Sequence, residues 1–143
     1  MKKLILALMF FATPALAASD FVMHRDPGCG CCEKWAAQVR AAFGRNVRII
    51  DDANRAAFDV RLGVPASLSG CHTAIIDGMT FEGHVPIADM KRVLTTKPRG
   101  VRGLAVAGMP LGSPGMEAPG QRAASFNVMR SEEHTSELQS HLM

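Results

Sequence analysis

Three of the four cysteines of this chain lie within four residues, where a strand pattern changes to a helix pattern. The short apolar run Phe21-Val22-Met23-His24 ends at Asp26-Pro27-Gly28, which is typical of a strand followed by a turn. The motif Cys29-Gly30-Cys31-Cys32, called the CxCC motif below, comes next. Apolar residues then recur at helical spacing until Gly44, a typical helix C-cap. The sequence therefore predicts a cysteine cluster at the start of a helix.

The following segments predict two more helices and three more strands. The predicted strands cover residues 47–50, 73–76 and 79–82, and the predicted helices cover roughly 55–62 and the segment after Pro86. The dipeptide Asp77-Gly78 indicates a hairpin between the last two of these strands. The order β-α-β-α-β-β-α predicts an α/β fold. Segment 97–121 is rich in Gly and Pro and is predicted to be irregular, whereas 126–129 is predicted to begin a strand.

This order also predicts where the cysteines meet. A right-handed β-α-β crossover makes the first two strands parallel. If the third strand runs opposite to the first, it begins at the edge of the sheet where the first strand ends, and the fourth strand finishes there. The CxCC motif, Cys71-His72 and Gly83-His84 are therefore expected to converge at one edge, although the first and last are more than fifty residues apart.

Both ends of the chain carry segments that we expect to lie outside the mature domain. Lys2 and Lys3, an apolar run, and the cleavage pattern Ala15-Leu16-Ala17 predict a secretory signal peptide over 1–17. The apolar run is too short to span a bilayer, so no membrane attachment is expected after cleavage.

Residues 130–143 resemble the translation of a common sequencing-library adapter, and we exclude them from the fold prediction. This exclusion also removes His134 and His141 from the candidate ligands. The predicted organisation is a domain over 18–96 and a truncated C-terminal extension over 97–129.

The charge of the chain does not favour a nucleic-acid partner. There are 16 Lys and Arg against 13 Asp and Glu, a formal net charge of +3. The basic residues are scattered without interleaved aromatic residues, so this charge bears on solubility rather than on recognition.

The cysteines allow more than one interpretation. Near a helix N-terminus, the macrodipole stabilises a thiolate, so the pKa of these thiols is expected to fall below the free value of about 8.5. Cys32 lies on the apolar stripe and is expected to be the least exposed, and Cys29 the most exposed. In an oxidising compartment the alternative is a pair of structural disulfides, with three pairings open to four cysteines. Adjacent Cys31 and Cys32 would bond to each other only with strain.

Methionine and histidine residues extend the set of candidate ligands. Met109 and Met116 flank a Gly/Pro loop, and thioethers together with thiolates select Cu(I). Core packing is the alternative role for these methionines, and a closed Cys₃His zinc site is the alternative for the thiols. His84 is expected beside the thiols and is interpreted either as a ligand or as a helix-end residue. His72 is a weaker candidate, because neighbouring side chains of an extended chain point to opposite faces and His72 directly follows Cys71. His24, at the end of the first strand, is weaker still.

Four segments, in this order, resemble the CopG-type periplasmic copper-resistance proteins. They are the CxCC motif, Cys71-His72-Thr73, Glu82-Gly83-His84-Val85-Pro86, and the run Gly108-Met109-Pro110-Leu111-Gly112-Ser113-Pro114-Gly115-Met116-Glu117. The resemblance covers nearly all of 20–129. It implies a thioredoxin-like domain with a metal-binding C-terminal extension, and a cysteine-bridged copper cluster that interconverts Cu(I) and Cu(II). In the family the chain continues as a strand where this one reaches Met129, so an edge of the sheet is expected to be missing.

The resemblance implies the following metal ligands. The family's CxCC thiols correspond to Cys29, Cys31 and Cys32, its later thiol corresponds to Cys71, and its extension corresponds to the segment with Met109 and Met116. With His84, these residues form the predicted copper site, and a periplasmic copper efflux system is the expected partner. The alternative function is a metal-free thiol–disulfide oxidoreductase that uses the CxxC spacing of Cys29 and Cys32. A third is a metallochaperone that passes copper on without redox change.

Overall fold

A computed structural model describes residues 21–132 and 139–141 of the chain. The helices are α1 (Gly30–Phe43), α2 (Arg55–Leu62) and α3 (Ile87–Thr96), with a 3-10 turn, η1, at Ala66–Leu68. The strands are β1 (Phe21–Arg25), β2 (Val47–Asp51), β3 (His72–Ile76), β4 (Met79–Glu82), β5 (Val101–Ala105), β6 (Val128–Glu132) and β7 (Gln139–His141). The predicted α/β fold and its order as far as α3 are confirmed. The expected signal peptide lies outside the described residues.

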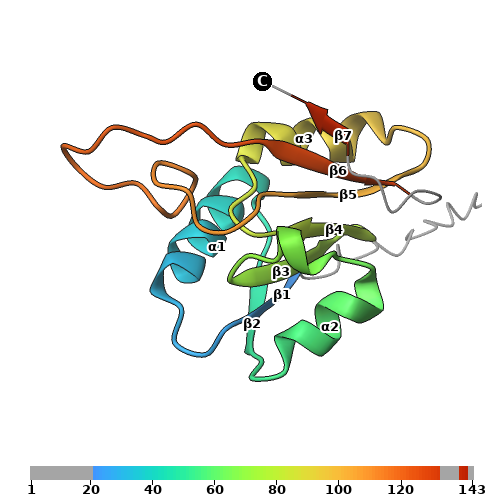
Figure 1. Cartoon of the computed structure of the whole chain (residues 1–143), viewed down its shortest axis with the longest axis horizontal. Helices are drawn as coiled ribbons and strands as arrows, with labels where there is room; N and C mark the ends of the chain where they lie inside the picture. Colours follow the sequence, from blue (N-terminus) through green and yellow to red (C-terminus); the bar gives the residue numbers. More distant parts are fainter. Residues whose placement is uncertain (1–20, 133–138, 142–143) are drawn as a thin grey trace, which may run out of the picture.

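All the strands join one mixed sheet in the order β2-β1-β3-β4-β5-β6-β7 (Figure 1). Strand β1 is parallel to β2 and antiparallel to β3, and β4 is antiparallel to β3. These are the directions on which the predicted convergence of cysteines depends. In the part of the chain that the structure describes, no helix combines the length and hydropathy needed to span a bilayer.

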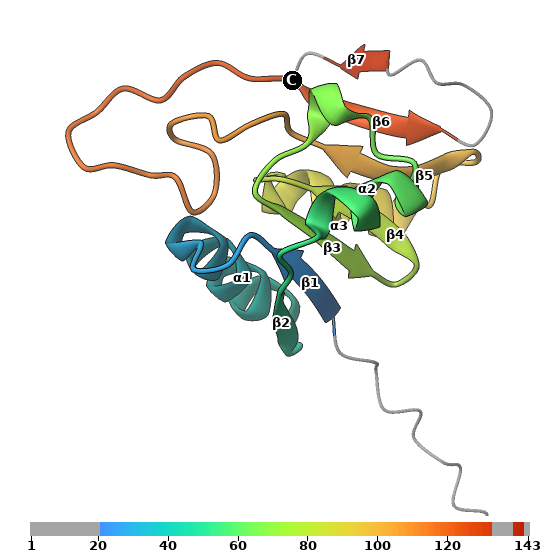
Figure 2. The same cartoon turned by 60° about the horizontal axis from the view of Figure 1, so that its bottom comes forward.

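Helices cover both faces of the sheet, with α1 and α3 on one side and α2 on the other (Figures 1 and 2). Side chains alternate between the faces along each strand. On β3, His72 packs against Trp35 of α1, whereas Thr73 contacts Arg55 of α2. The α1 face is largely apolar and the α2 face carries a buried polar cluster.

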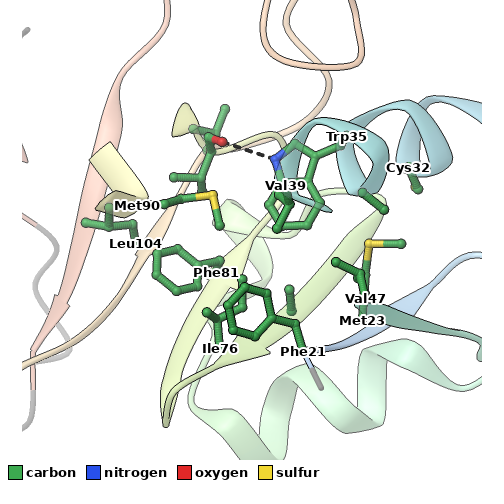
Figure 3. Close-up of a cluster of buried hydrophobic side chains, with 14 of the residues drawn as sticks. Phe21, Met23, Cys32, Trp35, Val39, Val47, Ile76, Phe81, Met90 and Leu104 are labelled. Carbon is green, nitrogen blue, oxygen red and sulfur yellow. Dashed lines mark hydrogen bonds between the residues drawn. The ribbon is translucent and has the colours of Figure 1, made fainter. Parts of the chain in front are cut away.

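The hydrophobic core lies between α1, α3 and the sheet (Figure 3). Trp35, Phe81, Phe21 and Met90 are each 0–1% exposed. The indole N–H of Trp35 donates to the carbonyl of Val85 at 3.1 Å, which satisfies its one polar group. This packing holds α1, and therefore the CxCC motif at its start, against the ends of β3 and β4.

Two predictions about the C-terminal part were wrong in detail. Segment 97–121 is not irregular throughout, because residues 101–105 form β5, which pairs with β4 in parallel. Its central Gly103 weakens the local strand pattern, and the pairing depends on tertiary context that sequence patterns do not contain. The strand expected to stop at Met129 runs on to Glu132 along the edge of β5. Six residues that the sequence analysis left out, 130–132 in β6 and 139–141 in β7, therefore belong to the sheet.

Candidate metal centre

The CxCC motif occupies the first turn of α1. Cys29 is the N-cap residue, and its backbone N–H donates to the carbonyl of Asp26 at 3.2 Å. Arg25 reaches back from β1 and donates to the carbonyl of Cys29 at 3.0 Å. Cys32 is fully buried, as predicted, while Cys29 and Cys31 are half-buried. The motif therefore presents two sulfurs near the surface and one toward the core.

One pair of cysteines is oxidised. A disulfide joins Cys29 and Cys32, whose Cα atoms are 5.4 Å apart, and Cys31 and Cys71 are free. Residues 21–132 thus contain one disulfide rather than the pair that a purely structural role for all four cysteines would require.

The four sulfurs form a single cluster at the predicted edge of the sheet. The Cys31 sulfur lies 3.2 Å from that of Cys29 and 3.8 Å from that of Cys71. The Cys71 sulfur is also 3.3 Å from that of Cys32. All four lie within 4.8 Å of one another, close enough to be bridged by metal ions.

Cys71 reaches the cluster because β3 begins where β1 ends. Its carbonyl accepts the backbone N–H of Asp26 at 3.0 Å, one residue past the pairing of Arg25 with His72. Burial, with a further contribution from Cys31, raises the pKa of the Cys71 thiol to about 12. The thiol is therefore protonated at neutral pH, and a metal ion would have to displace the proton on binding.

His84 lies beside Cys71, and its ring orientation is set by the C-terminal extension. Its Nδ1 lies 2.8 Å from the carbonyl of Pro114, and since a carbonyl only accepts, Nδ1 carries the proton. Its Nε2 lies 3.1 Å from the Cys71 sulfur and, in the neutral ring, accepts a hydrogen bond from the Cys71 S–H. Burial lowers the pKa of His84, which favours that neutral form. This is the arrangement of a metal-ligating imidazole fixed through its other nitrogen.

His72 is nearer to the site than the sequence analysis expected. It is fully buried, its Nδ1 lies 3.6 Å from the Cys71 sulfur, and its ring contacts that of His84. Its Nε2 is buried without a hydrogen-bond partner, and burial lowers its pKa well below the usual value. The alternation argument failed because Cys71 precedes the strand, so the two side chains need not point to opposite faces. His24, in contrast, pairs with Asp52 on the α2 side.

The C-terminal extension brings one thioether to the cluster. The loop between β5 and β6 runs beside α1 (Figure 1). The Met109 sulfur, on a side chain that is 54% exposed, lies 4.0 Å from that of Cys31. Gly115 packs so closely on α1 that a Cβ atom there would lie 2.6 Å from the carbonyl oxygen of Cys31. Met116 is half-buried, and its backbone N–H donates to the carbonyl of Ser113.

A buried arginine on the opposite face ties the ligand-bearing segments together, and no sequence motif marks it. The Arg55 guanidinium, on α2, donates to Asp26, before the CxCC motif, and to the carbonyl of Gly70, before Cys71. It also contacts Glu82, two residues before His84. These three neighbours, at positions 26, 70 and 82 of the sequence, meet at one arginine, which is 7% exposed.

The donor set has a clear chemical character. It combines four cysteine sulfurs with a thioether and two imidazoles, and no carboxylate belongs to the groups of potential ligands among the described residues. Thiolates and thioethers are soft ligands that suit Cu(I), while Mg²⁺ and Ca²⁺ prefer oxygen. The set therefore fits a soft metal ion.

Comparison with known proteins decides the family. The solved structure named "Copper resistance protein copG- Form 1" is 38% identical to this chain, with a TM-score of 0.77, and the match covers 87% of this chain and 95% of that one. This chain belongs to the CopG family of copper-resistance proteins. The structure named Form 2 of the same CopG protein is 39% identical, with a TM-score of 0.76, and the match covers 85% of this chain and 94% of that one.

A family model and the curated protein sequences give two further comparisons. The CopG-like family model, described as "Protein of unknown function, DUF411", matches residues 68–116, which include Cys71, His84 and Met109. Comparison with curated protein sequences gives no significant match. Membership of the CopG family confirms the resemblance noted in the sequence.

Proposed function

We propose that this protein binds copper as its cargo in copper resistance, in a cysteine-bridged site at the edge of the sheet. The observation that carries the proposal is the cluster of four cysteine sulfurs within 4.8 Å of one another, with His84 Nε2 and the Met109 thioether beside it. The proposed ligands are Cys29, Cys31, Cys32, Cys71, His84, Met109 and Met116. Cys71 is central, because it belongs both to the sulfur cluster and to the group with His72 and His84.

The proposal includes a place and a partner. We infer from residues 1–17 that the protein is exported to the periplasm, and a periplasmic copper efflux system is the partner to which the cargo would pass. Interconversion of Cu(I) and Cu(II) at the site is part of the same proposal. The support for it is a disulfide and two free thiols within one cluster of potential ligands.

The test is anaerobic titration of the fully reduced protein with Cu(I), followed by dialysis against a Cu(I) chelator and elemental analysis. We expect copper to be retained in competition with zinc, because soft ligands favour Cu(I). Cys71→Ser should reduce retained copper as severely as Cys31→Ser, since both sulfurs contact two other cysteines. One zinc per chain and no copper would instead identify a Cys₃His zinc site.

A second candidate function is supported by the Cys29–Cys32 disulfide itself. A disulfide with CxxC spacing at a strand-to-helix turn is the arrangement of thiol–disulfide oxidoreductases. The free thiol of Cys31, 3.2 Å from Cys29, argues against this function, because it competes with Cys32 for the mixed disulfide and would leave a Cys29–Cys31 disulfide in place of the Cys29–Cys32 one. Reduction of a model disulfide peptide by the metal-free protein, at a rate that copper does not affect, would favour this alternative.

A further inference from the structure

One peptide group of the C-terminal extension links an outer carboxylate to the ring of His84. The carbonyl of Pro114 accepts the Nδ1 proton of His84 at 2.8 Å. On the other side of the same peptide group, the N–H of Gly115 donates to a carboxylate oxygen of Glu117 at 2.8 Å. The hydrogen bonds therefore form a chain that runs from the Glu117 carboxylate, through the Pro114–Gly115 peptide, to the imidazole.

Glu117 also fixes this peptide group on helix α1. Its second carboxylate oxygen accepts the side-chain amide N–H of Gln38, on α1, at 2.8 Å. A Cβ atom at Gly115 would lie 2.6 Å from the carbonyl oxygen of Cys31 and 2.9 Å from the backbone nitrogen of Trp35. The extension is therefore seated on the first turns of α1, with no room to move closer to the helix.

The turn that contains this peptide group is closed on itself. The backbone N–H of Met116 donates to the carbonyl of Ser113 at 2.8 Å. The hydroxyl of Ser113 donates to the carbonyl of Pro110 at 2.7 Å, and Ser113 is fully buried. Because the turn is held together in this way, a contact that fixes one of its peptide groups also positions the others.

We propose that Glu117 is a positioning residue for His84 and acts on it through the Pro114–Gly115 peptide. The inference rests on the proposed copper-binding function, and Glu117 lies outside the groups of potential ligands among the described residues. A charged acceptor makes a strong hydrogen bond, and hydrogen bonds in a chain strengthen one another. Glu117 thereby keeps the ring proton of His84 on Nδ1 and leaves Nε2 as the atom that would bind copper. A carboxylate commonly orients a metal-ligating histidine through its second nitrogen, and here the carboxylate acts from one peptide group away.

The first test observes the His84 ring in the full-length, metal-free protein with its disulfide intact. Long-range ¹H–¹⁵N NMR spectra show which ring nitrogen carries the proton, and His84→Asn identifies the signals by their absence. We expect the wild-type ring to be protonated at Nδ1. Glu117→Gln removes the charge and one acceptor with little change of shape, so it should lower the population of this tautomer and speed exchange of the Nδ1 proton with solvent. Ring signals that Glu117→Gln leaves unchanged would overturn the inference.

Gln38→Ala is the matched control for this test. It removes the contact of Glu117 with α1 but leaves the hydrogen bond between Glu117 and the N–H of Gly115. The ring signals of His84 should therefore change less than they do in Glu117→Gln. An equal change in the two variants would show that the contact with α1 alone sets the ring, and would reject the role of the peptide.

The second test is a double-mutant cycle on Cu(I) affinity, measured by competition with a Cu(I) chelator. Glu117→Gln alone should lower the affinity about 10–100-fold. His84→Asn keeps an N–H that can bond to Pro114 but removes Nε2, so adding Glu117→Gln to it should lower the affinity no further. Additive losses would show that Glu117 affects copper independently of His84, which rejects the inference. If the wild-type protein retains no Cu(I), the proposed function itself fails, and the NMR spectra of the metal-free protein still decide whether Glu117 sets the His84 ring.

Discussion

At the scale of single residues, the site depends on neighbours that fix each donor atom. Pro114 fixes the proton of His84 on Nδ1, which leaves Nε2 directed at Cys71. Cys71 is 6% exposed and Met109 is 54% exposed, so the donors run from the surface into the protein. Different ligands are therefore expected to respond differently to mutation.

Met109→Leu should lower copper retention with little loss of stability. Leu preserves volume and apolarity, so the cost in the free energy of unfolding should be below about 1.5 kcal/mol, and the side chain is largely exposed. Met116→Leu is the matched variant in the same loop. Because Met109 is the methionine whose sulfur lies within 4.0 Å of a cysteine sulfur among the described residues, its variant should lose more copper. The measurements are copper per protein after dialysis and the melting temperature. Parallel loss of both quantities in Met109→Leu would make this residue part of the packing alone.

At the scale of elements, the sequence predicts well whatever is encoded locally. Periodicity and Gly44 place α1, and Asp77-Gly78 places the β3–β4 hairpin, within one or two residues. Strand direction then brings Cys71 to the CxCC motif. This prediction needed only the order and direction of the strands. The β5 strand was missed because its pairing with β4 is made across α3. Arg55 was missed because its role depends on three segments distant in sequence.

Gly70→Ala should separate the segments that carry Cys71 and His84. A Cβ atom at Gly70 would lie 2.8 Å from the Cα of Gly83, a backbone contact that cannot relax by a side-chain rotation. Overpacking of this kind costs about 1–3 kcal/mol of folding stability, and copper affinity should fall with it. Gly30→Ala is the control, because no atom lies within 4 Å of its Cβ position and Ala is favoured in a helix. Equal melting temperatures and copper affinities in the two variants would contradict the close approach.

Arg55→Lys should weaken copper binding from the far side of the sheet. Lys keeps the charge but loses the planar fork that contacts Asp26, Gly70 and Glu82 together. Loss of a residue that orients ligands typically lowers metal affinity about 10–100-fold. Arg40→Lys is the matched control, because Arg40 donates to the carbonyl of Val47, away from the cluster. Competition titration with a Cu(I) chelator measures both, and a fall in melting temperature without a fall in affinity would limit Arg55 to a structural role.

At the scale of the whole molecule, one sheet serves as the support for a site at its edge. The apolar core on the α1 face and the polar cluster on the α2 face hold the same strand ends from two sides. The extension then passes β5 and returns to α1, where Gly115 makes its close contact. The sequence predicts that the extension takes part through its methionines, and the structure brings the Met109 sulfur to 4.0 Å from that of Cys31. The sequence could not predict the path of the extension, because a Gly/Pro-rich loop has no periodicity.

Truncation tests how far the sheet extends. Residues 130–132 pair with Leu104, Gly103 and Val101 of β5, so ending the chain after Met129 should be more destabilising than ending it after Glu132. Each backbone hydrogen bond contributes about 0.5–1.5 kcal/mol net, and β5 would gain an exposed edge. Thermal unfolding of the two truncated chains measures the difference, and copper per protein should be the same in both. Equal melting temperatures would show that the sheet effectively ends at Met129.

The contact between Met109 and Cys31 spans 78 positions of the sequence. In an extended chain these two sulfurs are far apart, and Cys71 and His84 lie between them without a partner. The complete set of donors therefore exists only in the folded chain, although Cys29, Cys31 and Cys32 are neighbours in the sequence at every stage. Under the proposed function, an unfolded chain would offer copper the neighbouring thiols of the CxCC motif alone, and the full site would form together with the fold.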